Sequence, residues 1–192
     1  MTHQMIFPVI LPVPENERHF NGREKGITLS WHARQALYVS AQKSGLPLGN
    51  LPKDPDGVPL PIDGTYWSIT HKSDYVGAVV ARTRIGIDVE KIRSCSPALF
   101  KKTADDTEWA LGNEENTQQL FFMYWTAKEA VLKASGTGIT DLHKCRIIQL
   151  IDELHLAVDY RGQQWTVEHF FLDGYIASVV QNACQVQWMV LK

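Results

Sequence analysis

The chain has 192 residues, of which 44% are hydrophobic, 10% aromatic and 21% charged. This length corresponds to one domain or two small ones, and so large an apolar fraction excludes a disordered protein. With 19 Lys and Arg against 21 Asp and Glu, the net charge is −2, which excludes a protein that binds nucleic acid through bulk positive charge.

The first third of the chain predicts one helix followed by an irregular segment. A helix is expected over residues 30–44, with Ser30 as its N-cap and Gly45 as its stop signal. Five prolines then crowd residues 47–61. Because proline fixes φ and lacks an amide donor, this segment must be extended or turning.

The rest of the chain alternates between short β-branched runs, typical of strands, and longer apolar stripes, typical of helices. The expected strands cover residues 66–72, 76–83, 85–90, 145–151, 153–160, 164–171, 175–181 and 186–191. The expected helices cover 97–111 and 117–135, with the polar stretch GNEENTQ at 112–118 between them. Strands that follow one another through brief polar breaks favour antiparallel pairing, so the predicted fold class is α+β with small antiparallel sheets, not a parallel doubly wound fold.

The cysteines and the apolar segments indicate the cellular compartment of the protein. Cys95, Cys145 and Cys184 lie far apart and form no CxxC pair, so neither a disulfide framework nor a structural zinc site is expected. The N-terminal segment lacks the basic region and cleavage site of a secretory signal, and no apolar run approaches the length of a membrane span. We therefore expect a cytoplasmic protein with no membrane or nucleic-acid partner.

Residues 85–90, with the sequence IGIDVE, predict a strand that carries two carboxylates on one face. Alternate side chains of a strand share a face, so Asp88 and Glu90 project together, about 7 Å apart at their Cα atoms. Two such carboxylates repel each other unless a cation lies between them, and Mg²⁺ prefers oxygen ligands of this kind. The alternative is a strand end that reaches solvent, with Glu90 paired to Lys91 or Arg93.

Residues 125–133, WTAKEAVLK, predict a helix with Glu129 and Lys133 as neighbours on one face. A Glu-to-Lys pair at this spacing is also the ordinary stabilising pair of a solvated helix. Here, however, the helix is aromatic and apolar and runs into the turn GTGI at 136–139, where a flexible backbone can approach a ligand. The sequence has no P-loop and no GxGxxG, GxSxG or HExxH motif.

Together these two segments resemble the signatures of the 4′-phosphopantetheinyl transferases, in particular the longer, monomeric class that activates peptide and polyketide synthetases. The family's Gly-(Ile/Val)-Asp-x-Glu strand stands here as GIDVE at 86–90, and its Trp-x-x-Lys-Glu-(Ala/Ser)-x-x-Lys helix stands as WTAKEAVLK at 125–133. A weaker Ser-His block stands as SITH at 68–71, with threonine for the usual serine. The intervening aromatic and acidic positions also match, at Phe100, Glu108 and Trp109.

The resemblance, which covers about residues 50–140, implies a reaction. Phosphopantetheine would be transferred from coenzyme A to a serine of an apo acyl or peptidyl carrier protein, releasing 3′,5′-ADP. Asp88, Glu90 and Glu129 would hold Mg²⁺ against the coenzyme A diphosphate, with Glu90 the ligand that varies most among relatives. Lys133 would contact the same diphosphate and protonate the leaving phosphate, while Glu129 would take the proton from the carrier serine.

The resemblance also implies residues for the nucleotide. The 3′-phosphate would be bound by the weaker block, through Ser68, Thr70 and His71. Arg34 matches the family's basic helix residue, with a plain solvated helix charge as the alternative. The family's Gly-Lys-Pro segment stands here as GVP at 57–59, without its lysine. Lys53 is expected to supply that charge instead, unless it is only an exposed loop residue.

The implied architecture is two similar halves, residues 1–84 and 85–192, related by a pseudo-twofold axis. Coenzyme A would lie between them, with its nucleotide on the N-terminal half, and a single chain would suffice as a monomer. An acidic carrier would dock near residues 93–102 and 135–146. The basic residues expected there are Lys101, Lys102, Lys144 and Arg146.

Two other functions stay open at this point. The same carboxylates could serve a Mg²⁺-dependent phosphodiesterase that hydrolyses coenzyme A without a carrier. Alternatively, the chain could be an inactive homologue that binds carriers, although the intact Asp88, Glu129 and Lys133 argue against that function.

Overall fold

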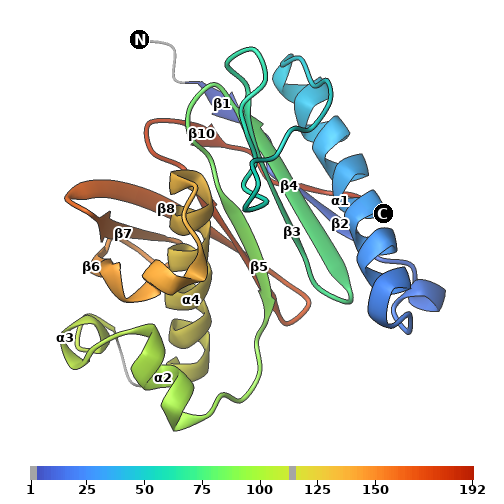
Figure 1. Cartoon of the computed structure of the whole chain (residues 1–192). Helices are drawn as coiled ribbons and strands as arrows, with labels where there is room; N and C mark the ends of the chain where they lie inside the picture. The colour runs from blue at the N-terminus through green and yellow to red at the C-terminus, as the bar shows by residue number, and fades with distance from the viewer. Residues whose placement is uncertain (1–3, 113–115) are drawn as a thin grey trace.

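The computed structural model describes residues 4–112 and 116–192, so part of the predicted polar stretch 112–118 lies outside the described residues. Two helix-on-sheet layers lie side by side, with helix α1 at one edge of the molecule and helix α4 within the other layer (Figure 1). This arrangement confirms the predicted α+β class with small sheets. Within the described part of the chain, no helix combines the length and hydropathy needed to cross a membrane.

The first layer consists of helix α1 (Gly22–Ser44) packed on a four-stranded sheet. The strand order is β11-β2-β4-β3, with bounds Met189–Val190, Val9–Pro12, Tyr75–Ala81 and Tyr66–His71 in that order. Strands β2 and β3 both run antiparallel to β4. Side chains of α1 that include Ala33, Ala36 and Leu37 are fully buried in the core between helix and sheet.

Helix α1 begins earlier than its sequence predicts. Its N-cap is Asn21, and Ser30 lies inside the helix, so the prediction of Ser30 as N-cap is wrong. The reason is that the buried stripe of α1 already includes Leu29, and the helix continues N-terminally through the exposed Gly26. The predicted end is confirmed, because Gly45 has a left-handed φ of 62° that glycine adopts without strain.

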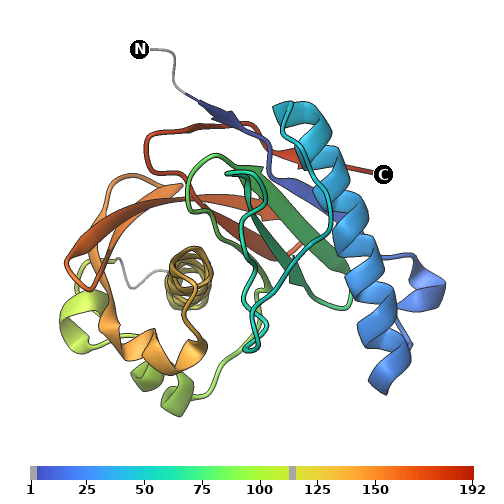
Figure 2. The same cartoon turned by 45° about the horizontal axis from the view of Figure 1, so that its top comes forward.

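The second layer consists of helix α4 (Thr117–Ser135) packed on a five-stranded sheet. The strand order is β5-β9-β8-β7-β6, with bounds Ile87–Lys91, Tyr175–Val180, Gln163–Leu172, His155–Tyr160 and Cys145–Leu150 in that order. All neighbouring strands in this sheet are antiparallel, as predicted. Figure 2 shows α4 end-on, with the sheet curving around it.

The predicted helix 97–111 is in fact two helices, α2 (Pro97–Thr103) and α3 (Asp106–Trp109). Ala104 has an extended backbone, and Asp105 starts a new helix as its N-cap. The Asp105 carboxylate accepts from the backbone N–H of Glu108, and the Glu108 carboxylate accepts from the backbone N–H of Asp105. This capping box favours a helix start at a place where the apolar spacing alone suggested continuity.

The remaining elements are short. A 3-10 turn, η1, covers Glu15–Glu17, and another, η3 (Ile139–Lys144), leads from α4 to β6. The ends of the chain pair in parallel, β1 (Met5–Ile6) with β10 (Gln185–Val186) and β2 with β11, which the antiparallel prediction did not include. The last strand therefore joins the sheet of the first layer, across the predicted boundary at residues 84 and 85. The two halves as separate units stay a prediction.

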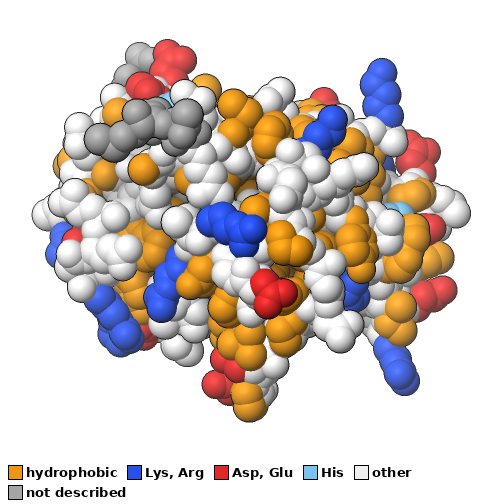
Figure 3. All heavy atoms as spheres, turned by 90° about the horizontal axis from the view of Figure 1, so that it is seen from above, with side chains coloured by type: hydrophobic (Ala, Val, Ile, Leu, Met, Phe, Trp, Pro, Cys, Tyr) orange, Lys and Arg blue, Asp and Glu red, His pale blue; other side chains and the backbone are white. Residues whose placement is uncertain are grey.

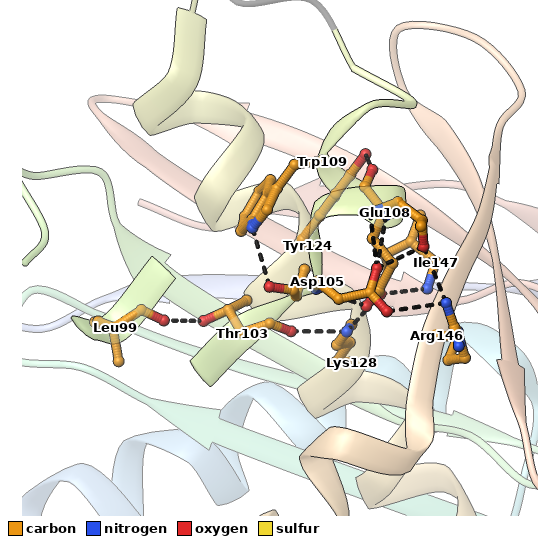
Figure 4. A network of polar contacts seen from close by, with 11 residues as sticks. Leu99, Thr103, Asp105, Glu108, Trp109, Tyr124, Lys128, Arg146 and Ile147 are labelled. Atoms are coloured by element: carbon orange, nitrogen blue, oxygen red, sulfur yellow. Dashed lines mark hydrogen bonds and ion pairs between the residues drawn. The ribbon is translucent and has the colours of Figure 1, made fainter. Parts of the chain in front are cut away.

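A buried ion pair joins α4 to the elements that follow and precede it in the chain (Figure 4). Lys128 Nζ lies 2.6 Å from the Glu108 carboxylate and donates to the carbonyl of Thr103 at 2.7 Å. The Glu108 carboxylate also accepts from the backbone N–H of Ile147 at 2.8 Å. Because burial disfavours its charged form, the pKa of Lys128 is lowered, although Glu108 opposes this shift. The pair thus connects α2, α3, α4 and β6.

A second buried contact fixes the middle of α4 on the sheet. Thr126 Oγ1 and Ser178 Oγ are 2.6 Å apart, and Ser178 Oγ is 2.7 Å from Nδ1 of His169. Burial lowers the pKa of His169 to about 3, so the imidazole is neutral near pH 7. The chain of three groups joins the helix to β9 and β8 without placing a charge in the core.

Helix α4 meets the start of strand β5 at Gly86. A Cβ atom at Gly86 would lie 1.9 Å from the carbonyl oxygen of Ala130 and 2.8 Å from the backbone nitrogen of Ala134. Both atoms belong to the helix backbone, which cannot turn aside as a flexible side chain can. The glycine of the GIDVE segment is therefore required by the close approach of the helix.

We expect Gly86→Ala to lower the free energy of unfolding by about 1–3 kcal/mol, because α4 must move away from the strand. The matched control is Gly26→Ala in α1, where nothing lies within 4 Å of the added Cβ. That substitution should raise the free energy of unfolding by about 0.5–1 kcal/mol. Urea unfolding followed by circular dichroism measures both free energies. Equal stability of the two variants would contradict the requirement for glycine at position 86.

We expect Lys128→Met to lower the free energy of unfolding by about 3–5 kcal/mol, because it leaves the Glu108 carboxylate buried without its cation. Lys101→Met, at an exposed position of the neighbouring helix α2, is the control and should change stability little. Combining Lys128→Met with Glu108→Gln should cost less than the sum of the single changes. Additive losses would show that the two groups do not act as a pair.

Candidate functional site

Two adjoining hollows lie where β3, β5 and α4 meet. The first, of about 360 Å³, is called the carboxylate pocket, and its polar lining is Thr70, His71, Lys72, Asp88, Glu90, Glu129 and Lys133. The second, of about 230 Å³, is called the loop pocket, and its lining includes Lys53, Gly57, Val58, Ser68, Lys133 and Gly136. Lys133 belongs to both, so the two hollows are neighbours. A larger hollow of about 650 Å³ beside α3 contains no predicted site residue.

Asp88 on β5 is paired with Lys133 on α4. The Asp88 Oδ1 atom accepts hydrogen bonds from Lys133 Nζ at 2.7 Å and from Thr70 Oγ1 at 2.9 Å. Lys133 Nζ also donates to the carbonyl of Ile87 at 3.1 Å. The other oxygen of Asp88, Oδ2, is buried and has no hydrogen-bond partner among the described residues. Since a buried carboxylate oxygen without a partner is unfavourable, Oδ2 is the atom of this pocket best placed to bind a cation.

Glu129 lies one helical turn before Lys133 and lines the same pocket. Its pKa is raised, first because burial disfavours the charged carboxylate and second because Asp88 repels it, while Lys133 opposes the shift. Over residues 4–112 and 116–192, no hydrogen bond or ion pair to the Glu129 carboxylate is found. Glu129 is therefore a carboxylate with an increased affinity for a proton.

Glu90, the third carboxylate, is already paired. Its Oε1 atom lies 2.6 Å from Nζ of Lys72, the residue that follows β3. The Glu90 side chain is 14% exposed and that of Lys72 is 38% exposed. The predicted alternative partners, Lys91 and Arg93, do not form this ion pair; Lys91 lies 3.6 Å from Asp74 instead.

The residues of the weaker block divide between the two faces of β3. Ser68 and Thr70 are buried, whereas His71 is exposed and lines the carboxylate pocket. Ser68 Oγ accepts from the backbone N–H of Ile87 at 3.2 Å, and Thr70 binds Asp88. Both hydroxyls thus hold β5 against β3.

The two basic residues assigned to the nucleotide lie in different places. Lys53 lines the loop pocket, with Nζ 6.0 Å from the centre of the Trp67 ring. Arg34 is on the exposed side of α1, where it donates to Ser30 Oγ at 2.7 Å, and it lines neither pocket. Every other predicted site residue lines at least one of the two pockets.

Lys72 was not singled out from the sequence, although it contributes a charge to the pocket. The available signal was its position directly after His71, at the end of a strand that had been linked to phosphate binding. Its partner Glu90 is on another strand, and sequence spacing carries no information about that contact.

Whether this pocket suits Mg²⁺ depends on the donor atoms that its side chains offer. In the described part of the chain, no group of three or more His, Cys, Asp or Glu side chains is positioned to hold a metal ion. The donors nevertheless suit Mg²⁺, which commonly takes one or two carboxylates and leaves its other positions to water and phosphate. Asp88 Oδ2 and the Glu129 carboxylate are the two donors that fit.

The face of the molecule drawn in Figure 3 shows no large patch of a single charge among the described residues. On the face drawn in Figure 3, basic and acidic side chains of the described residues are scattered among neutral and apolar ones. This distribution agrees with the near balance of 19 basic and 21 acidic residues.

Comparison with known proteins gives a consistent result. The chain is 38% identical over 90 residues to the 4′-phosphopantetheinyl transferase HetI of Nostoc sp., which covers 44% of this chain and 38% of that protein. It is 28% identical over 160 residues, 77% of this chain and 65% of the relative, to a Haemophilus influenzae protein provisionally named a 4′-phosphopantetheinyl transferase. It is 29% identical over 82 residues, 41% of this chain and 35% of the relative, to the 4′-phosphopantetheinyl transferase psf-1 of Bacillus pumilus. The chain thus spans about a third to two thirds of the length of these curated relatives.

The sequence profile of the 4′-phosphopantetheinyl transferase superfamily matches residues 84–180. These residues make up half of the chain and include β5, α4 and the whole five-stranded sheet. They carry Asp88, Glu129 and Lys133 of the carboxylate pocket. The chain therefore belongs to the 4′-phosphopantetheinyl transferase superfamily.

Proposed function

We propose that this protein transfers the 4′-phosphopantetheine group of coenzyme A to a serine of an apo acyl or peptidyl carrier protein, with Mg²⁺ as cofactor. The observation that carries this proposal is the meeting of Asp88, Glu129 and Lys133 in one pocket, formed by one face of α4 and one face of β5. An ammonium, a free carboxylate and an unpartnered carboxylate oxygen at one place supply what transfer from a diphosphate needs.

In the proposed reaction, the carrier serine attacks the phosphorus that bears the pantetheine arm. The bond from that phosphorus to the bridging oxygen breaks, and 3′,5′-ADP leaves. The Glu129 carboxylate accepts the serine proton as a general base. Lys133 neutralises charge on the departing phosphate and returns a proton to it, which yields the holo-carrier and 3′,5′-ADP.

Asp88 and Glu129 are the residues that would hold Mg²⁺, with Glu90 as the third predicted ligand. The ion would withdraw charge from the phosphate oxygens at which negative charge develops. Asp88 contributes its unpartnered Oδ2, while its Oδ1 keeps Lys133 and Thr70 in place.

We propose that coenzyme A lies across the carboxylate and loop pockets. Lys53 and Ser68 would face the nucleotide from the loop pocket, and His71 and Thr70 from β3. Arg34 remains a proposed contact for coenzyme A, although it lines neither pocket. The pseudo-twofold relation of the two halves is likewise a proposal, supported by one long helix on a sheet in each layer.

The carrier is proposed to dock beside α2 and η3, on a basic surface that suits an acidic helix. A hollow of about 150 Å³ there is lined by residues that include Lys101, Lys102, His143 and Arg146. Arg146 is partly neutralised by Asp105 at 3.0 Å, and Lys144 by Asp141 at 2.8 Å. Lys101 and Lys102 are exposed and would meet the partner first. One cytoplasmic chain is proposed to suffice, with no nucleic acid or membrane involved.

The reaction is tested by incubating the protein with coenzyme A, Mg²⁺ and a panel of apo carriers, with mass spectrometry of the carrier as readout. The expected result is a phosphopantetheine increment on the carrier, lost when Mg²⁺ is removed with EDTA. Hydrolysis of coenzyme A without an increment would support the phosphodiesterase function instead. Carrier binding with neither reaction would indicate an inactive homologue.

We expect Glu129→Gln and Lys133→Ala each to reduce transfer by at least about 10²-fold, since each removes a proton-transfer or charge-stabilising group. Matched controls are Glu24→Gln and Lys43→Ala, which are exposed on α1 and outside both pockets. The controls should transfer at the rate of the unchanged protein. Circular dichroism establishes that each variant is folded, and full activity of either site variant would refute its assigned role.

A further inference from the structure

We propose that Lys72 binds phosphate oxygens of the substrate, and that Glu90 is the positioning residue that holds its ammonium group in the carboxylate pocket. This inference rests on the proposed function and adds to it a residue that the sequence motifs do not contain. It also gives Glu90 a role other than metal ligand.

The first argument is the contact itself. Lys72 Nζ lies 2.6 Å from Glu90 Oε1, and both residues line the pocket that contains Asp88, Glu129 and Lys133. An ammonium group has three N–H donors, and Glu90 occupies one. The Lys72 side chain is 38% exposed, so its remaining donors can reach an anion that enters the pocket.

The second argument is that the backbone beneath Lys72 is held in place. Lys72 begins the turn between β3 and β4, and its backbone N–H donates to the carbonyl of Tyr75 at 2.8 Å. Tyr175 donates to Asp74 Oδ2 at 2.5 Å, and Tyr75 donates to Asp173 Oδ2 at 2.8 Å. These reciprocal hydrogen bonds tie the β3–β4 turn to the β8–β9 turn. Lys72 is therefore presented to the pocket from a fixed turn, although it lies at a strand end.

The third argument is the charge of the pocket. Three carboxylates face it, and a diphosphate would add further negative charge. Lys133 is paired with Asp88 and Lys72 with Glu90, and both lysines line the pocket. Without Lys72, Glu90 would repel the substrate at close range. With it, the pocket offers a second ammonium to the phosphate oxygens.

The consequence for Glu90 follows from the same contact. A carboxylate oxygen that is paired with an ammonium is a poorer metal ligand than an unpartnered one, because the ion pair must first be broken. Glu129 has no such pair among the described residues, and Asp88, whose Oδ1 is paired with Lys133, keeps a buried Oδ2 without a partner there. Two carboxylates are enough for Mg²⁺, with phosphate oxygens and water completing its shell.

The test measures binding of coenzyme A and of inorganic pyrophosphate by calorimetry in EDTA, and binding of Mn²⁺ alone by electron paramagnetic resonance. The variants are Lys72→Ala, Glu90→Gln and the double variant, and the control is Lys91→Ala, a neighbouring lysine whose side chain is 60% exposed and lies outside the pocket. Thermal unfolding establishes that every variant is folded.

We expect Lys72→Ala to weaken the binding of both anions about tenfold, which corresponds to about 1.4 kcal/mol, with no change for Lys91→Ala. The double variant, which restores the net charge of the pocket, should stay at least fivefold weaker than the unchanged protein. Recovery of full affinity in the double variant would overturn the inference, because Lys72 would then only neutralise Glu90. Glu90→Gln should leave Mn²⁺ affinity within twofold, and a tenfold loss would make Glu90 a metal ligand.

The outcomes separate this inference from the proposed function. If the unchanged protein transfers phosphopantetheine and Lys72→Ala binds both anions normally, the role of Lys72 is wrong and the function stands. If pyrophosphate binding depends on Lys72 while no carrier is modified, the role of Lys72 stands and the function is wrong.

Discussion

Helix α4 and strand β5 approach so closely at Gly86 that no Cβ atom fits between them, and this contact sets the distance between the charged groups on the two elements. Lys133 follows Ala130 by three residues and Asp88 follows Gly86 by two, and Lys133 Nζ donates to Asp88 Oδ1 at 2.7 Å. The helix is held there by neutral hydrogen bonds to β9 in its middle and by the buried Lys128–Glu108 pair on another side. A glycine therefore determines the geometry of the pocket without taking part in its chemistry.

The carboxylate pocket contains two ion pairs and one further carboxylate without an ion-pair partner among the described residues. Each of two carboxylates has an ammonium beside it, Asp88 with Lys133 and Glu90 with Lys72. Glu129 has no ion-pair partner in the part of the chain that the structure describes, and its pKa is raised by burial and by Asp88. Paired charges of this kind tolerate burial, while Glu129 and the Asp88 Oδ2 atom are the two donors proposed to bind a cation. In the proposed complex, the metal ion would neutralise the remaining carboxylate charge together with the charge of the diphosphate.

The sequence predicted what depends on local spacing and missed what depends on contacts between distant elements. Alternation along a strand placed Asp88 and Glu90 on one face, and helical spacing placed Glu129 beside Lys133, because both periods are properties of the backbone. The partner of Glu90 could not be predicted, since Lys72 follows a strand of the other sheet and meets Glu90 only after the sheets pack together. The break at Asp105 was missed because a capping box competes with an apolar pattern that continues through it. Arg34 was assigned by resemblance, and its place on α1 depends on how that helix packs.

The parallel pairing of Met189–Val190 with Val9–Ile10 has a consequence for the newly synthesised chain. The two strands are about 180 residues apart in the sequence, so this sheet cannot be completed until Met189–Val190 has left the ribosome. Until then, β2 has one unpaired edge, which other chains can bind. Contacts of such large sequence separation also slow folding, because the intervening chain must be ordered first. Strand β3 of this sheet carries Thr70 and His71, so the carboxylate pocket depends on a sheet that is completed late in folding.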